Sequence, residues 1–199
     1  MLPILCKTEL IIIFEKFKFL FLKNSEYLPK IIFTHRLILI PFTTEICTEI
    51  LNNKFEIIET LGLKKGEKWP DLDILETLPK IIKNLSKVVS PTGFESWMIV
   101  KKEGNQIIGD IGFKGFNQSD NTCDIGYGII EAERRNGYAE EASKSLIDWV
   151  LKVDSSIDIT ASTLIENEGS IRLLKKLNFI DTDADEKFIY WKLLKNYRQ

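Results

Sequence analysis

The chain has 199 residues, of which 44% are hydrophobic and 28% charged, and its formal net charge is −2. These values are typical of a water-soluble globular protein with one domain and a sizeable core. The slight negative charge argues against a nucleic-acid partner, because such binding relies on a broad basic surface. Three widely spaced cysteines and a single histidine form no CxxC pair. We therefore expect no disulfide framework, no metal site and a cytoplasmic location.

Residues 1–33 form an apolar extension ahead of a domain that we place at 34–199. The segment 10–22 is very apolar but carries Glu15, Lys16 and Lys18. It falls short of the roughly 20 largely uncharged residues of a bilayer-spanning helix, and no small-residue cleavage site of a signal peptide follows it. We expect no transmembrane span. Two interpretations stay open: an extra element packed on the domain, or a segment that binds a membrane surface or forms a homodimer.

The first part of the domain is predicted to contain one strand and two helices. Alternating side chains predict a strand over 34–42, with Pro41 near its end. Thr43 or Thr44 can cap the helix that follows. A second helix is predicted over 71–89, interrupted at Pro79. Its expected buried face consists of Leu72, Leu75, Leu78, Ile82 and Leu85.

The second part alternates strands with helices. The predicted elements are strands over 96–102, 106–113, 124–130, 157–164 and 186–194, and helices over 137–151 and 167–178. The first three strands have short connections, which predicts an antiparallel meander. The strand–helix–strand order that follows predicts a right-handed crossover between two parallel strands. We expect the last strand to close the sheet.

The connection between strand 124–130 and helix 137–151 carries the pattern Arg134-x-x-Gly137-x-Ala139. A helix that begins directly after a sharp turn presents unpaired backbone N–H groups at the positive end of its dipole. Such a helix start binds anions, phosphates in particular. Gly137 lets the backbone approach a ligand closely, and Arg134 and Arg135 add charge that matches phosphates. The sequence therefore predicts an anion site here.

Four segments, in this order, resemble the GNAT N-acetyltransferase superfamily over about residues 34–194. They are THRLILIPF from Thr34, GNQIIGDIGF from Gly104, DIGYGI…RRNGYAEEA from Asp124 and ENEGSIRLLKKLNF from Glu166. The third resembles the family's acetyl-CoA motif, (Q/R)-x-x-G-x-(G/A). The IGYGI sequence and the TxRL start are similar to the branch of ribosomal-protein N-terminal acetyltransferases. The resemblance implies an α/β (α+β) GNAT fold: a mixed, mostly antiparallel central sheet with helices on both faces and a splayed parallel pair of strands at the acetyl-CoA site.

The resemblance also implies which residues bind acetyl-CoA. Those expected to hold the pyrophosphate, mostly through backbone N–H groups, are Arg134, Arg135, Asn136, Gly137, Tyr138 and Ala139. Those expected to pair with the pantetheine arm are Gly128, Ile129 and Ile130. The thioester carbonyl would accept a hydrogen bond from the Ile129 N–H, an oxyanion-type contact. Asn167 would bind a pantetheine amide or, alternatively, cap a helix.

The activity implied by the resemblance is transfer of an acetyl group from acetyl-CoA to a primary amine, by direct attack in a ternary complex. The acceptor typical of the branch is the α-amine of a protein or peptide. Two alternatives stay open: a small amine such as an amino acid, a polyamine or an antibiotic, and a module that binds acyl-CoA without catalysis. The acidic overall charge slightly favours cationic acceptors.

Several positions depart from the family pattern. Ser162 stands where some members carry a general-base Glu. The region of Leu173 and Leu174 replaces the Tyr that often protonates the departing thiolate. Asn178 stands where the family usually has Gly, and an Asn tolerates the left-handed backbone that such a turn needs.

The incoming amine must lose a proton before or during its attack, and a carboxylate can take it. Asp124 is the first candidate, since related sequences carry Glu there; it can also be a residue that only binds a cationic substrate, or a solvated bystander. Five residues separate it from Ile129, which puts the two side chains on opposite faces unless a bulge at Gly126 or Gly128 shifts the phase.

The remaining candidates are a proton donor and two further carboxylates. Ser170 can donate a proton to the thiolate or cap its helix. Glu95 and Glu166 are further candidate bases. Because attack is direct, Cys123 is not expected to act as a nucleophile.

Overall fold

The structure is a computed structural model that describes residues 12–13, 15–16 and 31–194. Its central feature is a nine-stranded sheet with the order β1-β2-β4-β5-β6-β7-β9-β8, in which the short β3 pairs with β5. Only β6–β7 and β3–β5 are parallel pairs among the described strands. The strands are β1 (Ile32–Phe33), β2 (Leu37–Pro41), β3 (Lys64–Lys65), β4 (Ser96–Lys101), β5 (Gln106–Asn117), β6 (Thr122–Ile129), β7 (Asp158–Leu164), β8 (Phe179–Ala184) and β9 (Phe188–Leu193). The predicted mixed, mostly antiparallel sheet is confirmed.

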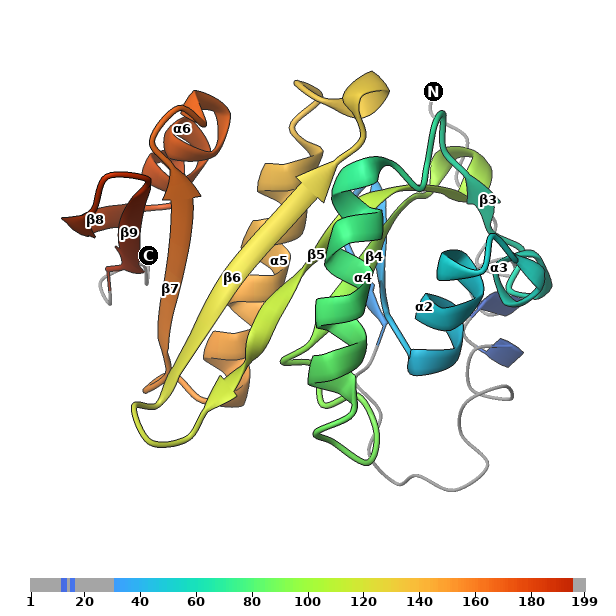
Figure 1. Cartoon of the computed structure of the whole chain (residues 1–199), viewed down its shortest axis with the longest axis horizontal. Helices are drawn as coiled ribbons and strands as arrows, with labels where there is room; N and C mark the ends of the chain where they lie inside the picture. Colours follow the sequence, from blue (N-terminus) through green and yellow to red (C-terminus); the bar gives the residue numbers. More distant parts are fainter. Residues whose placement is uncertain (1–11, 14, 17–30, 195–199) are drawn as a thin grey trace.

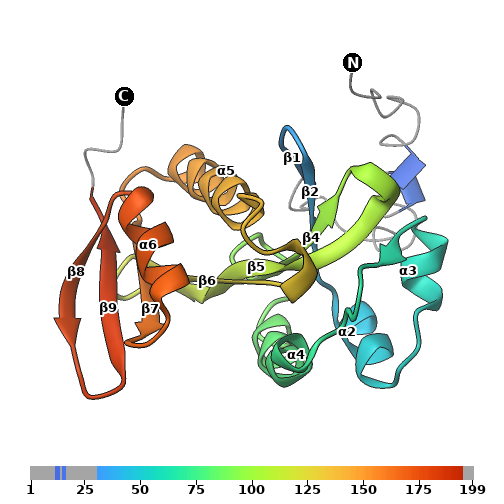
Figure 2. The same cartoon turned by 90° about the horizontal axis from the view of Figure 1, so that it is seen from above.

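Helices cover both faces of this sheet (Figures 1 and 2). Helix α5 (Tyr138–Val153) lies on one face, and α6 (Glu168–Lys176) lies beside β7 on the same side. Helices α2 (Thr44–Leu51) and α4 (Leu72–Leu85) lie on the other face, with the short α3 (Glu56–Thr60) after α2. The strand β6 is therefore flanked by α5 on one side of the sheet and by α4 on the other.

Local sequence explains where α2 and α4 begin. The Thr43 side chain accepts the Ile46 N–H at 3.3 Å, and the Asp71 side chain accepts the Ile74 N–H at 3.1 Å. Each cap satisfies one of the N–H groups that the first turn of a helix leaves without a partner, which stabilises the helix by about 1 kcal/mol. The prediction that a threonine caps α2 is confirmed.

Helix α4 differs from its predicted pattern in which side chains it buries. Its buried residues are Ile74, Leu78, Ile81 and Leu85. Leu72, expected in the buried face, is 76% exposed. Pro79 does not interrupt the helix: it removes one helical hydrogen bond, and the buried face of four large side chains offsets that loss. The tertiary packing of α4 thus selects a stripe rotated from the one that periodicity alone favoured.

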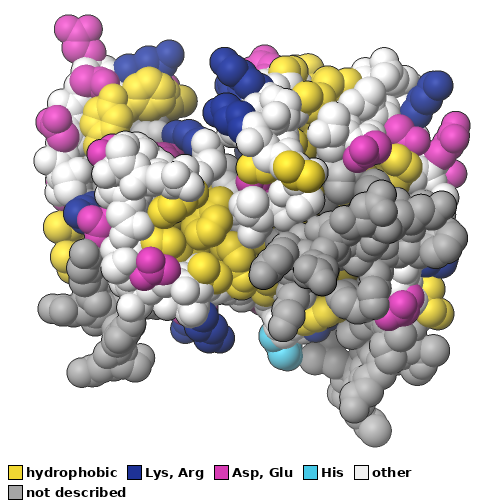
Figure 3. Space-filling view, turned by 90° about the horizontal axis from the view of Figure 1, so that it is seen from below, with side chains coloured by type: hydrophobic (Ala, Val, Ile, Leu, Met, Phe, Trp, Pro, Cys, Tyr) yellow, Lys and Arg dark blue, Asp and Glu magenta, His cyan; other side chains and the backbone are white. Residues whose placement is uncertain are grey.

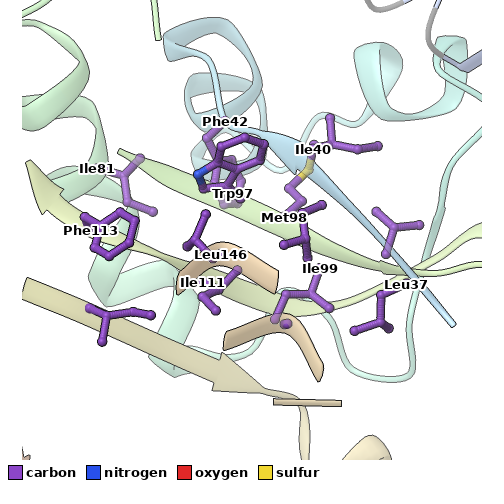
Figure 4. Packing of buried hydrophobic residues seen from close by; sticks show 14 of the residues in the cluster. Leu37, Ile40, Phe42, Ile81, Trp97, Met98, Ile99, Ile111, Phe113 and Leu146 are labelled. Carbon is purple, nitrogen blue, oxygen red and sulfur yellow. The ribbon is translucent and has the colours of Figure 1, made fainter. Parts of the chain in front are cut away.

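The core lies between the sheet and the helices on its two faces. Figure 4 shows buried side chains of β2, β4 and β5 together with those of α4 and α5. Trp97, Ile111 and Leu146 are fully buried there, and the Trp97 indole N–H donates to the Gly93 carbonyl at 3.1 Å. Each large apolar side chain contributes about 1.5–3 kcal/mol when it is fully buried. This core fixes β5 and β6, the two strands on which the site described below is built.

Strands β6 and β7 begin side by side and then separate. Their parallel pairing ends at Ile125 and Ala161, although β6 continues to Ile129 and β7 to Leu164. Figure 1 shows the resulting V, closed at its lower end and open at its upper end between α6 and the connection to α5. The splayed parallel pair that the sequence predicted is confirmed.

The C-terminal edge of the sheet differs from the prediction. Strand β9 does not close the sheet, because β8 lies beyond it at the edge and pairs with it as a hairpin. Five of the six residues of β8 are exposed, so no alternation of apolar and polar residues marked this strand. Asn178, directly before β8, has φ of 62°, which confirms the left-handed conformation predicted for it.

The N-terminal extension lies mostly outside the described residues, so its two interpretations stay predictions. Of the part that is described, Ile13 is buried in the core, and Ile32 and Phe33 pair with β2. No helix in the described part of the chain is long and apolar enough to cross a membrane.

Candidate active site

The open part of the V presents an edge of β6 that no strand covers. Ile130 donates its N–H to the Ile108 carbonyl of β5 at 2.9 Å. Because successive N–H groups along a strand point in opposite directions, those of Ile129 and Tyr127 point away from β5 and into the V. Strand β7 has already separated at that level. An extended molecule can therefore add to this edge as a further strand would.

The start of α5 lies at the open end of the V. Gly137, directly before the helix, has φ of 79°, and no side chain in the described residues caps the helix there. Glycine adopts this left-handed conformation without the steric cost that a Cβ brings. The first N–H groups of α5 and its positive dipole end stay available, a geometry that fits a phosphate. Arg135, with φ of 63°, and Asn136 are both exposed beside it.

A polar cluster fastens this connection to the beginning of β2. Glu141, in the first turn of α5, accepts the Thr34 hydroxyl at 2.6 Å and the Arg36 backbone N–H and Nε at 2.7 Å each. Arg36 also donates to the Asn136 carbonyl at 2.9 Å, and its guanidinium lies 4.6 Å from the centroid of the Tyr138 ring. Burial alone would raise the pKa of Glu141, but the hydrogen bonds from Thr34 and Arg36 lower it below its ordinary value.

Thr34, Arg36 and Glu141 were not among the predicted site residues. Thr34 and Arg36 belong to the TxRL sequence at the start of the domain. That sequence marks the two residues but does not show what they contact. Their contact with Glu141 joins residues more than 100 positions apart. It exists only because β2 and α5 pack next to each other in the fold.

Arg134 braces the end of β6. Its Nε donates to the Ile129 carbonyl at 2.8 Å, and one of its terminal nitrogens lies 3.8 Å from a carboxylate oxygen of Asp73. On the neighbouring turn, Glu133 pairs with Lys101 of β4, and this hydrogen bond raises the pKa of Lys101. Both contacts hold the connection in place. The predicted contact of Arg134 with a phosphate stays a prediction.

Asn167 and Ser170 lie on the opposite side of the V, at the start of α6. The Asn167 side chain accepts the Ser170 N–H at 3.0 Å, so Asn167 caps α6. Of the two roles that the sequence left open for Asn167, the capping role is the one seen. The Tyr127 hydroxyl donates to the Ser170 carbonyl at 3.5 Å, a contact that joins β6 to α6 across the V.

Two side chains that could take part in catalysis, Cys123 and Glu95, are buried in structural contacts. Cys123 is 2% exposed, and burial together with the negative charge of Asp124 raises the pKa of its thiol to about 12. A thiol in this state is a poor nucleophile. The buried Glu95 accepts the N–H groups of Thr92 and Gly93, which makes it part of a turn. In the part of the chain that the structure describes, no group of His, Cys, Asp and Glu side chains is arranged to hold a metal ion.

A hollow of about 510 Å³ lies on the other face of β6, against α4. Gly126 and Gly128 form part of its floor, and a Cβ built on Gly126 would meet no atom within 4 Å. The lysines that line it are Lys80, Lys83, Lys87 and Lys114. Seen from below, the surface is hollowed between the two halves of the molecule, with Lys and Arg side chains on both sides (Figure 3). A second pocket of about 470 Å³ shares Asp73 with this hollow and extends to Arg134.

Asp110 lies at the floor of the same hollow. It is opposite Gly128 in the pairing of β5 with β6, and a Cβ built on Gly128 would lie 3.1 Å from its Oδ1. Within the described residues its carboxylate has no hydrogen-bond or ion-pair partner. Burial, with smaller contributions from the negative charges of Asp71 and Asp73, raises the pKa of Asp110 to about 7. Asp110 was not a predicted site residue, because a lone polar residue within a strand pattern carries no signal of its own.

Asp124 lies on the same face of β6, further from the open end of the V. The bulge in this region is in β5, which has one extra residue between Phe113 and Phe116, and β6 is regular from Ile125 to Ile129. No bulge at Gly126 or Gly128 shifts the phase of β6, so the side chains of Asp124 and Ile129 lie on opposite faces, as the regular strand spacing predicts. The Asp124 carboxylate pairs with Lys114 at 2.6 Å.

Comparison with known proteins decides the family. The family model described as an acetyltransferase (GNAT) domain matches residues 36–180. The chain belongs to the GNAT acetyltransferase family. The uncharacterized N-acetyltransferase YjdG of Bacillus subtilis (strain 168) is 35% identical over 136 residues, which cover 68% of this chain and 81% of YjdG.

Solved GNAT structures share the fold at low sequence identity. A GNAT-family acetyltransferase from Bacillus anthracis has a TM-score of 0.56 at 16% identity and covers 83% of this chain and 99% of its own. The ribosomal-protein-S5-alanine acetyltransferase from Vibrio fischeri has a TM-score of 0.58 at 16% identity, with 84% and 98% covered. These values establish a common architecture.

As a GNAT N-acetyltransferase, the chain takes its acetyl group from acetyl-CoA. The V and the start of α5 fit that molecule, because one offers free strand-edge N–H groups and the other an uncapped helix start. The predicted cofactor residues of β6, of the connection 134–139 and of α6 lie around the V. The two predicted catalytic residues are not brought together: Asp124 lies on the α4 side of the sheet and Ser170 at the start of α6.

Proposed function

We propose that this GNAT enzyme acetylates the α-amine of a protein or peptide, by direct attack of the amine on acetyl-CoA in a ternary complex. The observation that carries the proposal is the construction of β6. One edge of the strand is open to an extended arm, and the adjacent face opens into a hollow of about 510 Å³ at the surface. A chain end can enter such a hollow from solvent while the rest of the acceptor stays outside.

In this proposal acetyl-CoA lies along the V. Its pyrophosphate binds the N–H groups of residues 135–139 with help from the Arg134 side chain, and its pantetheine arm adds to β6 at residues 128–130. The N–H groups of Tyr127 and Ile129 both point into the V, so either can donate to the thioester carbonyl. Asn167, which caps α6, supports the opposite side of the V and bounds the arm there.

The charges around the hollow favour an acceptor that carries acidic groups close to its α-amine. The hollow is lined by four lysines, on or just after α4 and on β5, and by two aspartates, Asp73 and Asp110, so positive charges outnumber negative ones. A polycation such as a polyamine would be repelled by them, whereas an acidic peptide would be attracted. This local charge outweighs the slightly acidic overall charge, because Coulomb interactions in salt decay over about 8–10 Å. A protein acceptor is also in keeping with the fold shared with a ribosomal-protein acetyltransferase.

Ser170 and Asp124 are the proton donor and acceptor that the sequence proposed. Ser170 lies beside the V at the start of α6, so its hydroxyl can protonate the departing thiolate directly or through water. Asp124 is held by Lys114, which also donates to the Ser162 hydroxyl at 3.2 Å. The Lys114 ammonium occupies the Asp124 carboxylate, so this arrangement supports neither the base interpretation nor the binding of a cationic acceptor by Asp124.

The proposal is tested by thiol release from acetyl-CoA with a panel of acceptors. The panel holds an acidic hexapeptide with a free α-amine, the same peptide with a blocked α-amine, a lysine-rich hexapeptide and spermidine. We expect thiol release with the free acidic peptide and a mass increase of one acetyl group on it. Release with spermidine alone would favour a small-amine enzyme, and CoA binding without release on any acceptor would leave a non-catalytic module.

A further inference from the structure

We propose that Asp110 is the residue that takes the proton from the incoming amine, in an acceptor pocket formed by α4, β5 and the two glycines of β6. This inference rests on the proposed function, because it requires an amine acceptor. It adds a catalytic residue on a strand that the sequence did not connect with the chemistry.

The first argument is position. Asp110 of β5 faces Gly128 of β6 as a direct pairing partner, so their Cα atoms lie about 4.5–5.5 Å apart. Gly128 lies between Tyr127 and Ile129, the two residues whose N–H groups point into the V. The carboxylate is therefore next to the thioester position, whichever of the two N–H groups the thioester carbonyl uses.

The second argument is the space around the carboxylate. Gly128 has no side chain to cover Asp110, and a methyl group there would already lie 3.1 Å from Oδ1. At Gly126 the floor of the pocket is open. The two glycines thus leave space between the hollow and the edge of β6, and of the two carboxylates that line the hollow, Asp110 is the one paired with Gly128.

The third argument is the comparison with Asp124. A strand rises about 3.3 Å per residue, so Asp124 lies roughly 10 Å from Tyr127 and 17 Å from Ile129 along β6. A carboxylate side chain cannot span either distance. The Asp124 carboxylate also forms an ion pair with the Lys114 ammonium at 2.6 Å, which holds it away from the V. Asp110 is close to the reaction position and has no such partner.

Electrostatics agrees with this geometry. The charged groups that line the hollow around Asp110 are Asp73, Lys80, Lys83, Lys87 and Lys114; Asp71 precedes α4, and Asp124 pairs with Lys114. Of these, the two aspartates at the start of α4 add to burial in raising the pKa of Asp110 to about 7. A base with a pKa near the working pH is both ionised often enough to accept a proton and basic enough to hold it.

The proton balance of the step is simple. The acceptor arrives as an ammonium, and Asp110 takes one proton, directly or through one water. The freed nitrogen lone pair forms the C–N bond to the acetyl carbon, and the C–S bond breaks with its electron pair on sulfur. The nitrogen releases its second proton, the thiolate takes one, and Asp110 returns the other to solvent. The products are the acetamide, CoA and one proton.

The test compares Asp110→Asn with Asp124→Asn, using acetyl-CoA and the acidic hexapeptide with a free α-amine. General-base catalysis contributes about 10²–10⁴ in rate, so we expect kcat of Asp110→Asn to fall at least about 100-fold. The KM for acetyl-CoA should change little. In the wild type kcat should rise with pH up to about 7, and this inflection should be absent in Asp110→Asn. Asp124→Asn should keep the inflection.

A structural role for Asp110 predicts a different result. Because the folded protein raises the pKa of Asp110, ionised Asp110 disfavours folding above pH 7, and Asp110→Asn should melt no lower than the wild type at pH 8. Asp110→Glu should retain part of the activity and the pH inflection, since it keeps the carboxylate. A lower melting temperature of Asp110→Asn, with Asp110→Glu equally inactive, would overturn the proposal.

The outcomes separate this inference from the proposed function. If Asp110→Asn keeps the wild-type kcat and pH profile, Asp110 is not the base and the acetyltransferase proposal stands. If Asp124→Asn instead loses the inflection, Asp124 is the base. If the wild type acetylates spermidine but no peptide, the proposed peptide acceptor is wrong. The Asp110 variants are then compared with the wild type on spermidine. If no amine is acetylated, both proposals fail together.

Discussion

The two sides of β6 differ in the groups that line them: backbone N–H groups on one side and charged side chains on the other. The V, where we propose that acetyl-CoA binds, is lined by backbone N–H groups of β6 and by the uncapped start of α5. The hollow against α4, where we propose that the acceptor binds, is lined by side chains of both charges, and glycines form part of its floor. The first side is held by Arg36, Glu141, Lys101 and Glu133 in fixed contacts, whereas the lysines of the second side are exposed.

We attribute this difference in lining to the two molecules that we propose for the two sides. Backbone groups have the same chemistry in any sequence, so a fold can keep a site for one cofactor while its side chains vary. An acceptor is recognised through charge and shape, which side chains supply. The cofactor side therefore depends on conformation, and the acceptor side on residue identity. Substitutions on the two sides should separate these effects.

The largest effect is expected at Gly137, whose φ of 79° a β-branched side chain adopts only with strain. Gly137→Val should displace the start of α5, raise the KM for acetyl-CoA about tenfold or more, equivalent to at least about 1.4 kcal/mol, and lower the melting temperature. Calorimetric titration with CoA measures the affinity directly. Gly126→Ala is the matched control, because the added methyl group meets open space on the acceptor side. Equal losses of CoA affinity in Gly137→Val and Gly126→Ala would contradict the proposal that CoA binds on one side of β6 and the acceptor on the other.

An intermediate effect is expected at Glu141, which joins α5 to Thr34 and Arg36. Glu141→Gln should lower the free energy of unfolding by about 1–3 kcal/mol at pH 7, since it weakens charge-assisted hydrogen bonds in a partly buried place. Folding lowers the pKa of Glu141, so the stabilisation is present above its ordinary pKa and is lost as the pH falls through the lowered value. The gap between wild type and variant should therefore close in acid.

Urea unfolding across this pH range measures that gap. Glu168→Gln is the control, because Glu168 forms an exposed i,i+4 pair with Arg172 on α6. Such a pair contributes about 0–1 kcal/mol, so its loss should be small at every pH. A gap for Glu141→Gln that does not depend on pH would show that its carboxylate is not ionised in the fold.

The smallest effect is expected at the lysines of the hollow. Lys80→Gln combined with Lys83→Gln should raise the KM for the acidic hexapeptide about three- to tenfold at low salt, because two attractive charges are removed. The difference should fade at high salt. The KM for acetyl-CoA should not change. Lys144→Gln with Lys152→Gln, on the exposed face of α5, is the control of equal charge. An equal change of the peptide KM in both double variants would contradict the proposed preference for an acidic acceptor.

Local signals made the cofactor side predictable. The pattern Arg134-x-x-Gly137-x-Ala139, the strand before it and the helix after it are contiguous, and each conformation depends on nearby residue types. The meander, the parallel crossover and the left-handed Asn178 were confirmed for the same reason. Strand β8 was missed because almost all of its residues are exposed, and the buried stripe of α4 was misplaced because packing selects among several apolar faces.

The acceptor side depended on contacts between distant segments. Asp110 acquires its burial and its proximity to Gly128 only when β5 pairs with β6 and α4 covers them. One contact on the side of the V has the same dependence, because Glu141 meets Arg36 only when α5 packs beside β2. By itself the sequence therefore determined the fold family and the strand–turn–helix conformation of the connection 134–139, which rest on local backbone conformation. The tertiary structure alone decided which carboxylate stands beside Gly128 and the free edge of β6, because burial and distance between strands are properties of the packed molecule.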